Sequence, residues 1–268
     1  MPHRDLIVVG ASAGGVEALQ MLVAYLPNDL AATVLVVLHG SSALAKILSR
    51  ASARPVSTAQ DGDRLEPPRI LVAPAGSHLL VHDDHVELTQ GPRVNGHRPA
   101  IDPLFLSAAE WRGPRAIGVI LSGTLDDGSA GMRALVRSGG PGLVQDPAEA
   151  VYSEMPLHAL RAAPDCEVSK VARMGARLGQ LTKEEVDEHG GTLDIEERRE
   201  TEQNMRSSEM PALEGKPSAF SCPDCHGVLW ELSDGEAVRY RCRVGHAFSP
   251  ATLSALQEDA LEEALWTA

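Results

Sequence analysis

Short apolar segments alternate with longer amphipathic stretches over the first two thirds of the chain. The segments are apolar throughout instead of alternating with polar residues, which is typical of strands covered on both faces. They span residues 6–10, 33–38, 70–73, 116–121 and 142–144. Strands of this kind, separated by helical stretches, predict an α/β fold with a doubly wound, mostly parallel sheet.

One further segment has the pattern of an antiparallel hairpin. Residues 77–91, SHLLVHDDHVELTQG, hold two alternating strands on either side of Asp83 and Asp84. Two alternating strands around a short polar pair are typical of a hairpin turn. We expect this hairpin to form a flap or an edge of the main domain.

The last third of the chain changes character. Residues 181–218 are rich in charge and poor in aromatic and β-branched side chains, so they bury too little apolar surface to offset their ordering entropy. The chain is therefore predicted to divide into a main domain over residues 1–180, a charged linker over 181–218 and a small module over 219–268. The module closes with a helix for which Ser249 is the expected cap.

Charge and length narrow the setting. The chain of 268 residues carries a formal net charge of -13 at pH 7, which argues against a broad basic surface and so against nucleic acid as a partner. No apolar run has the length of a membrane span, and the N-terminus enters a strand without signal-peptide architecture. We expect a cytoplasmic protein without membrane insertion.

The turn after the first strand, GASAGG at residues 10–15, admits two interpretations. A dinucleotide-binding loop needs a bare glycine where Ser12 stands, and an acidic residue at the end of the next strand, where His39 stands. The alternative is G-x-S-x-G, a tight turn that exposes Ser12 as a nucleophile. The residues favour the nucleophile.

A serine nucleophile needs partners. A base must take the hydroxyl proton, and a carboxylate must orient that base. His39 ends the second strand, and Asp126 and Asp127 follow the strand at 116–121. The carboxyl ends of parallel strands meet at one edge, where α/β sheets form their active sites. We therefore expect Ser12, His39 and one of the two aspartates to meet there.

Five segments together resemble the catalytic domain of the chemotaxis protein-glutamate methylesterase (CheB) family. They read VVGASAGGVEAL, RILVAPAGSHLLV, NGHRPAIDPLF, GVILSGTLDDGSAGM and VQDPAEAVYSEMP, in this order over about residues 6–171. By this resemblance Ser12 is the nucleophile, His39 the base and Asp127 the orienting carboxylate. Asp126 is a lesser candidate for the role of Asp127.

The resemblance also implies a reaction and further site residues. The implied substrates are glutamate methyl esters of a methylated chemoreceptor-like protein, and family members also deamidate receptor glutamines. The backbone N–H groups of Ala13 and Thr124 are implied to hold the oxyanion, and no catalytic cofactor is expected. His97 and Arg98 have two open interpretations: they hold an acidic substrate helix, or Arg98 pins its own loop.

Two departures from the family pattern affect the expected regulation and activity. The receiver domain that usually precedes this fold is not expected, since Met1 stands five residues before the first strand. This departure favours a first alternative to a methylesterase, a related serine hydrolase or deamidase acting on a non-chemotaxis protein. The loop after His39 is also shorter than in the family, which leaves a second alternative, a catalytically inactive zinc-ribbon adaptor.

Three of the four cysteines lie near the C-terminus in a pattern typical of a zinc ribbon. Cys222, Cys225, Cys242 and His246 have the spacing C-x2-C-x16-C-x3-H, which offers four ligands to tetrahedral Zn²⁺. Four protein ligands leave no open position, so the metal is predicted to be structural. We expect the ribbon to contact a partner protein.

Overall fold

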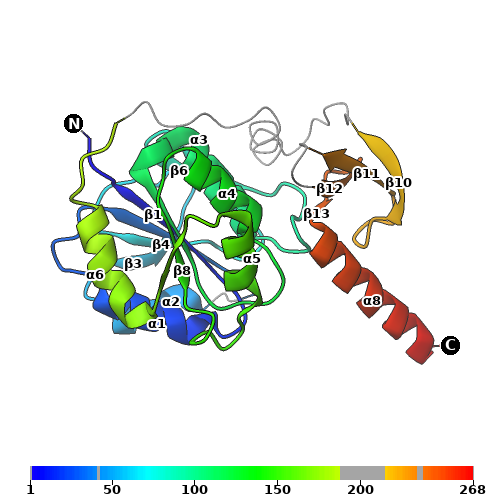
Figure 1. The fold of residues 1–268 in the computed structure, drawn as a ribbon, viewed down its shortest axis with the longest axis horizontal. Helices are drawn as coiled ribbons and strands as arrows, with labels where there is room; N and C mark the ends of the chain where they lie inside the picture. Colours follow the sequence, from blue (N-terminus) through cyan, green and yellow to red (C-terminus); the bar gives the residue numbers. More distant parts are fainter. Residues whose placement is uncertain (1, 41–42, 188–214, 234–237, 268) are drawn as a thin grey trace.

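A seven-stranded parallel sheet forms the centre of the molecule (Figure 1). The structure is a computed structural model that describes residues 2–40, 43–187, 215–233 and 238–267. In sheet order the strands are β3 (Val56–Thr58), β4 (Ile70–Val72), β2 (Thr33–Leu38), β1 (Leu6–Ala11), β7 (Ala116–Ile120), β8 (Gly142–Gln145) and β9 (Glu167–Ser169). All neighbouring strands of this sheet pair in parallel, which confirms the predicted fold class.

Helices cover both faces of this sheet. One face carries α1 (Gly15–Tyr25), α2 (Leu44–Ala51) and α6 (Val171–Leu181), and the other carries α3 (Ile101–Arg112), α4 (Ser129–Arg137) and α5 (Glu154–Ala162). A short 3-10 helix, η1 (Gly113–Arg115), follows α3. Val8 packs into the core under α3 and α4, while its neighbours Ile7 and Val9 pack into the opposite core. Central strands are apolar throughout because both of their faces are buried.

The order of the strands reverses direction at β1. Strands β2, β3 and β4 lie on one side of β1, and strands β7, β8 and β9 lie on the other side. Ligand sites in open α/β sheets form at such a reversal, outside the carboxyl ends of the strands. The turns that follow β1, β2 and β7 are therefore brought to one place.

The predicted hairpin is present. Strands β5 (His78–His82) and β6 (His85–Thr89) pair antiparallel. Asp83 lies in the left-handed region at φ +48°, a conformation that aspartate tolerates in a two-residue turn. Leu79 and Val86 of the hairpin pack into the core beside α3, so the hairpin covers the outer side of that helix.

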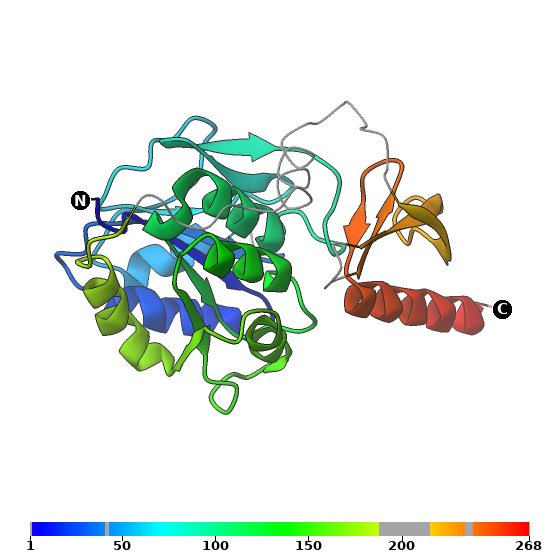
Figure 2. The same ribbon diagram turned by 45° about the horizontal axis from the view of Figure 1, so that its top comes forward.

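A second, smaller sheet lies beside the main domain (Figures 1 and 2). It consists of β10 (Lys216–Ser221), β11 (Val228–Ser233), β12 (Val238–Cys242) and β13 (Ala247–Phe248), all paired antiparallel. Helix α8 (Pro250–Thr267) follows β13 and projects outward. Most of the predicted linker, over residues 188–214, lies outside the described residues. Among the described helices, none combines the length and the apolar character needed to cross a membrane.

Candidate active site

Ser12, His39 and Asp127 form one chain of hydrogen bonds at the carboxyl edge of the sheet. They follow β1, β2 and β7 respectively. The Nδ1 atom of His39 lies 3.0 Å from Ser12 Oγ, and its Nε2 atom lies 2.8 Å from Asp127 Oδ2. A neutral imidazole satisfies both contacts when Nε2–H donates to the carboxylate and Nδ1 accepts from the hydroxyl. This arrangement allows the histidine to take the serine proton.

The backbone around Ser12 explains the glycines of its motif. The N–H of Ser12 donates to the carbonyl of Ser122 at 2.9 Å and ties the two turns together. Gly14 has φ +69°, and a Cβ there would lie 2.8 Å from Val151 Cβ. A Cβ on Gly123 would lie 2.9 Å from the Cβ of Ser12. Only glycine fits at these two positions, so the turn can hold Ser12 close to the neighbouring loop.

Two backbone donors flank the nucleophile. Ala13 follows Ser12 directly, and Thr124 follows Gly123, whose backbone is packed against Ser12. Within the described part of the chain, no hydrogen bond uses the N–H of Ala13 or of Thr124. Free donors of this kind beside a serine suit an oxyanion. Their role remains a prediction.

Asp127 is buried and strongly hydrogen-bonded. Its Oδ2 atom accepts the N–H of Ile101 at 2.7 Å as well as the contact from His39. Ile101 begins α3, so the positive end of that helix faces the carboxylate. Burial opposes ionisation, but the hydrogen bond and charge of His39, together with the N–H of Ile101, hold the pKa of Asp127 well below its usual range. The carboxylate is therefore ionised.

The structure separates the two candidate aspartates. Asp127 contacts His39, whereas Oδ1 of Asp126 accepts the hydroxyl of Ser249 at 2.7 Å and that of Thr252 at 2.9 Å. Ser249 precedes α8 and Thr252 lies in its first turn, so Asp126 is a contact for the C-terminal module. No pattern in the sequence pointed to this contact.

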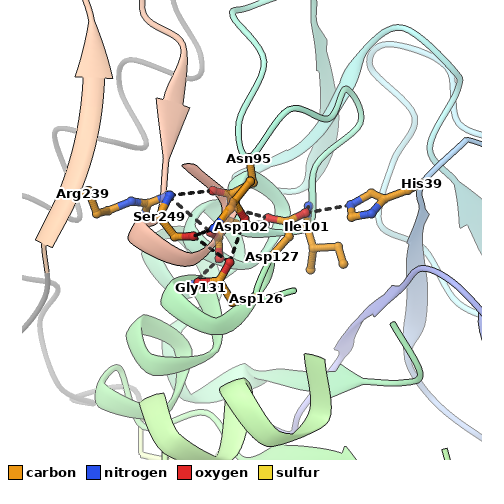
Figure 3. A network of polar contacts seen from close by, with 10 residues as sticks. His39, Asn95, Ile101, Asp102, Asp126, Asp127, Gly131, Arg239 and Ser249 are labelled. Atoms are coloured by element: carbon orange, nitrogen blue, oxygen red, sulfur yellow. Dashed lines mark hydrogen bonds and ion pairs between the residues drawn. The ribbon is translucent and has the colours of Figure 1, made fainter. Parts of the chain in front are cut away.

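Asn95 is a second residue that sequence reasoning missed. It is 2% exposed, and its Nδ2 donates to Asp127 Oδ1 at 3.0 Å (Figure 3). Its φ is +50°, as an asparagine followed by glycine readily adopts in a tight turn. The Asn–Gly pair was therefore a signal for the turn, but nothing in it indicated a contact with Asp127.

The structure places the neighbouring residues His97 and Arg98 in two different environments. The ring of His97 stacks on that of His39, with centroids 3.7 Å apart and planes 10° apart. Burial, reinforced by His39, lowers the pKa of His97 to about 4, so the stacked ring is neutral near neutral pH. Arg98 Nη1 donates to the carbonyls of Gln90 at 3.0 Å and Gly91 at 2.8 Å. These bonds fit the loop-pinning interpretation, and a substrate contact remains a prediction.

His78 supports the loop that leads into α3. Its side chain is fully buried, with Nε2 donating to the carbonyl of Pro92 at 2.9 Å and Nδ1 accepting the N–H of Ala100 at 3.2 Å. Burial lowers its pKa from the ordinary 6.5 to about 4, because a charged imidazolium there would lose its hydration.

Burial of neutral His78 is therefore expected to make the folded protein less stable in mild acid. Between pH 6.5 and about 4 the unfolded chain binds a proton at His78 that the folded chain does not, so the free energy of unfolding falls as pH falls. The loss at this one residue approaches about 3 kcal/mol. Urea unfolding at both pH values should show a clearly smaller loss in His78→Gln. An equal loss in wild type and variant would contradict the assignment.

Four potential metal ligands converge in the C-terminal module. Cys222 and Cys225 lie in the turn after β10, Cys242 ends β12, and His246 precedes β13. The ligand atoms of these four residues all lie within 4.8 Å of one another. The donor set could hold a metal ion, and thiolates with an imidazole suit Zn²⁺. The remaining cysteine, Cys166, is buried in the core of the main domain.

Comparison with known proteins finds relatives for the main domain. The family model described as CheB methylesterase matches residues 7–178. The protein-glutamate methylesterase/protein-glutamine glutaminase 1 of Xanthomonas campestris pv. campestris is 39% identical over 184 residues, which are 66% of this chain and 51% of that protein. The corresponding enzyme 5 of Anaeromyxobacter dehalogenans is 43% identical over 164 residues, 58% of this chain and 45% of that protein. The chain thus spans about half the length of these curated relatives.

A solved structure matches the same region. The catalytic domain of the CheB methylesterase of Thermotoga maritima superposes with a TM-score of 0.64 at 28% identity, covering 66% of this chain and 98% of that domain. The resemblance carried by the five sequence segments is confirmed. The C-terminal module, from β10 onward, lies beyond the residues that the family model matches.

Proposed function

Because the chain belongs to the CheB methylesterase family, we propose that it is a serine esterase that hydrolyses glutamate methyl esters on a methylated chemoreceptor-like protein. One observation carries this proposal: the hydrogen-bond chain from Ser12 through His39 to Asp127 at the carboxyl edge of a CheB-type sheet. The relatives are protein-glutamate methylesterases, which supplies the ester class of the proposal, the methyl ester of a protein glutamate.

The proposed reaction follows from the positions of these atoms. Ser12 Oγ attacks the ester carbonyl carbon while Nδ1 of His39 takes its proton, and Asp127 stabilises the imidazolium. The oxyanion of the tetrahedral intermediate accepts hydrogen bonds from the N–H groups of Ala13 and Thr124. His39 then protonates the departing methoxide, methanol leaves, and an acyl-enzyme remains. Water, deprotonated by the same histidine, attacks the acyl-enzyme and releases glutamate.

The same groups would also serve the deamidation of glutamine. Attack on a glutamine side chain would release ammonia instead of methanol, in keeping with the glutaminase part of the relatives' names.

The distance of 3.0 Å between His39 Nδ1 and Ser12 Oγ supports an active enzyme over an inactive adaptor, because the base is within reach of the nucleophile despite the short loop that follows His39.

For the C-terminal module we propose a structural zinc ion on Cys222, Cys225, Cys242 and His246. Among the described residues of this module, five buried residues form its hydrophobic core, which is little apolar surface for an independent sheet. A tetrahedral metal would tie its two turns together. We further propose that the ribbon contacts a partner protein and that the chain works in the cytoplasm.

Methanol release tests the proposed function. Wild-type protein incubated with receptor methylated by a chemotaxis methyltransferase should release methanol at a rate that depends on enzyme concentration, and an unmethylated receptor should give none. A fluorophosphonate probe should label Ser12 in the same preparation. Labelling of Ser12 without methanol release would contradict the proposal and favour a serine hydrolase that acts on another protein substrate. Absence of both labelling and methanol release would favour the catalytically inactive adaptor.

A further inference from the structure

The C-terminal module is joined to the main domain through backbone pairing. Val94 and Ala247 form a parallel bridge. The N–H of Asn95 donates to the carbonyl of Ala247 at 2.7 Å, and the N–H of Ala247 donates to the carbonyl of Arg93 at 3.2 Å. Val94, Ala100 and Ala247 are buried together. Residues 93–95 therefore act as a docking strand for β13.

The side chain of Asn95 connects this docking strand to the active site. Its Oδ1 atom accepts the N–H of Ser249 at 2.9 Å. Its Nδ2 atom donates to Asp127 Oδ1 at 3.0 Å and to Asp102 Oδ2 at 3.1 Å. Because only the oxygen of an amide accepts and only its nitrogen donates, the N–H of Ser249 forces the nitrogen of Asn95 toward the two carboxylates. Figure 3 shows this amide between Ser249 and Asp127.

Three further contacts reach the neighbouring carboxylates from the module. Arg239 Nη2 on β12 lies 3.4 Å from Oδ2 of Asp102, which is 2% exposed. The hydroxyls of Ser249 and Thr252 both bond Asp126, the residue before Asp127. Asn95 contacts Oδ1 of Asp127, whereas His39 binds Oδ2, so the module supports this carboxylate through Asn95, at the oxygen that does not face His39.

Two of the metal ligands lie close in sequence to Ala247 and Ser249, the residues that contact Asn95. His246 immediately precedes Ala247, and Ser249 follows three residues after the histidine. The carbonyl of His246 accepts the N–H of Cys242 at 3.0 Å, so the last ligand pair is held in one turn. A metal bound to Cys242 and His246 would therefore fix the backbone that presents Ala247 and Ser249 to Asn95.

We propose that Asn95 is a positioning residue of the catalytic triad and that metal binding in the C-terminal module sets its orientation. This inference rests on the proposed function. With the module seated, Asn95 holds Asp127 in place for His39; without metal, β13 and Ser249 lose their fixed position and the amide loses its orienting partner. The module is then a built-in activator of the esterase, and metal loss lowers turnover without any metal contact to substrate.

The experiment compares the full chain loaded with Zn²⁺ and the same chain treated with a chelator. Two rates are followed: phosphonylation of Ser12 by a fluorophosphonate, which needs the triad but no particular ester, and methanol release from methylated receptor. Chelation should lower both rates roughly 10- to 100-fold, the effect of losing a hydrogen bond to a buried charged group. The loss should lie in kcat, with KM little changed, and re-addition of Zn²⁺ should restore it.

Asn95→Gly provides the matched variant, because glycine accepts the φ of +50° at this position without strain. We expect the variant to be as slow as the chelated wild type and to lose nothing more on chelation. Ser249→Ala, which removes the bond to Asp126 and keeps the N–H, should show a smaller loss. Ser254→Ala, an exposed serine on α8, should behave as wild type.

Each other outcome decides against the proposal. Unchanged phosphonylation after chelation, or equal further loss in Asn95→Gly, would show that the module does not act through this amide. Thermal unfolding of the main domain is recorded for every sample. If Asn95→Gly unfolds, the wild type decides: phosphonylation of Ser12 that falls on chelation and returns with Zn²⁺, while the main domain stays folded, supports the proposal, and unchanged phosphonylation overturns it. Failure of the proposed function is distinguishable, since methanol release would then be absent from the zinc-loaded wild type while Ser12 phosphonylation still reports on the triad.

Discussion

Replacing Ser12 with alanine is expected to lower the rate of ester hydrolysis by about 10⁶-fold. Within the triad, only Ser12 Oγ bonds to the ester carbon. Alanine at this position has no hydroxyl, so His39 has no proton to take. The remaining rate would come from substrate binding and from the N–H groups of Ala13 and Thr124, which act on water poorly placed for attack.

The triad should respond as one unit. His39→Ala alone, and the double variant with Ser12→Ala, are expected to be about as slow as Ser12→Ala, because each change interrupts the same proton transfer. Methanol release under single-turnover conditions measures all three. Ser49→Ala, an exposed serine on α2, is the control and should keep the wild-type rate. A Ser12→Ala protein within tenfold of wild type would remove Ser12 as the nucleophile.

The meeting of these three residues could be predicted because each one lies in the turn that follows a strand. A parallel sheet brings the residues after β1, β2 and β7 to one edge, so the position of Ser12, His39 and Asp127 along the chain was enough to bring them together. The choice between the two neighbouring aspartates rested on resemblance to the family, and the contact of Asp127 with His39 agrees with it.

The contacts that Ser249 makes with Asn95 and Asp126 could not be predicted in this way. Ser249 was expected as a helix cap, and its Oγ does accept the N–H of Thr252 at 3.0 Å. That bond is local and has a sequence signature. Its bonds to Asn95 and Asp126 join residues 154 and 123 positions apart, across a segment whose composition predicts only a linker. Contacts between the C-terminal module and the main domain leave no periodicity in the sequence of either one. Only the three-dimensional structure shows which residues meet.

The imidazole of His39 also has an orientation that the sequence does not specify. Nδ1 faces the nucleophile and Nε2 faces the carboxylate, so the proton transferred from Ser12 resides on Nδ1 in the proposed reaction. The stacked ring of His97 limits rotation of this imidazole about its side-chain bonds. Because His97 is neutral near neutral pH, it can support the ring without opposing the charge that His39 acquires.

Replacing Cys242 with serine is expected to release the metal and unfold the small sheet of the C-terminal module. The free energy of structural zinc binding is about 10–16 kcal/mol. In the part of the module that the structure describes, the hydrophobic core consists of five buried residues, which offset little of the ordering entropy. Cys242 pairs with Leu229 on β11 and its N–H bonds His246, so loss of this ligand also separates the two turns.

Zinc analysis and hydrogen exchange test this expectation on the full chain. Wild type should contain about one zinc per chain, as four ligands allow, and should protect the amides of β11 and β12. Cys242→Ser should lose both the zinc and the protection, while β1 and β7 in the main domain stay protected. Cys166→Ala, a buried cysteine of the main domain, is the matched control and should keep the metal. If Cys242→Ser retained stoichiometric zinc and protected amides, the module would owe its fold to its own side chains, and the metal would have no part in presenting Ser249 to Asn95.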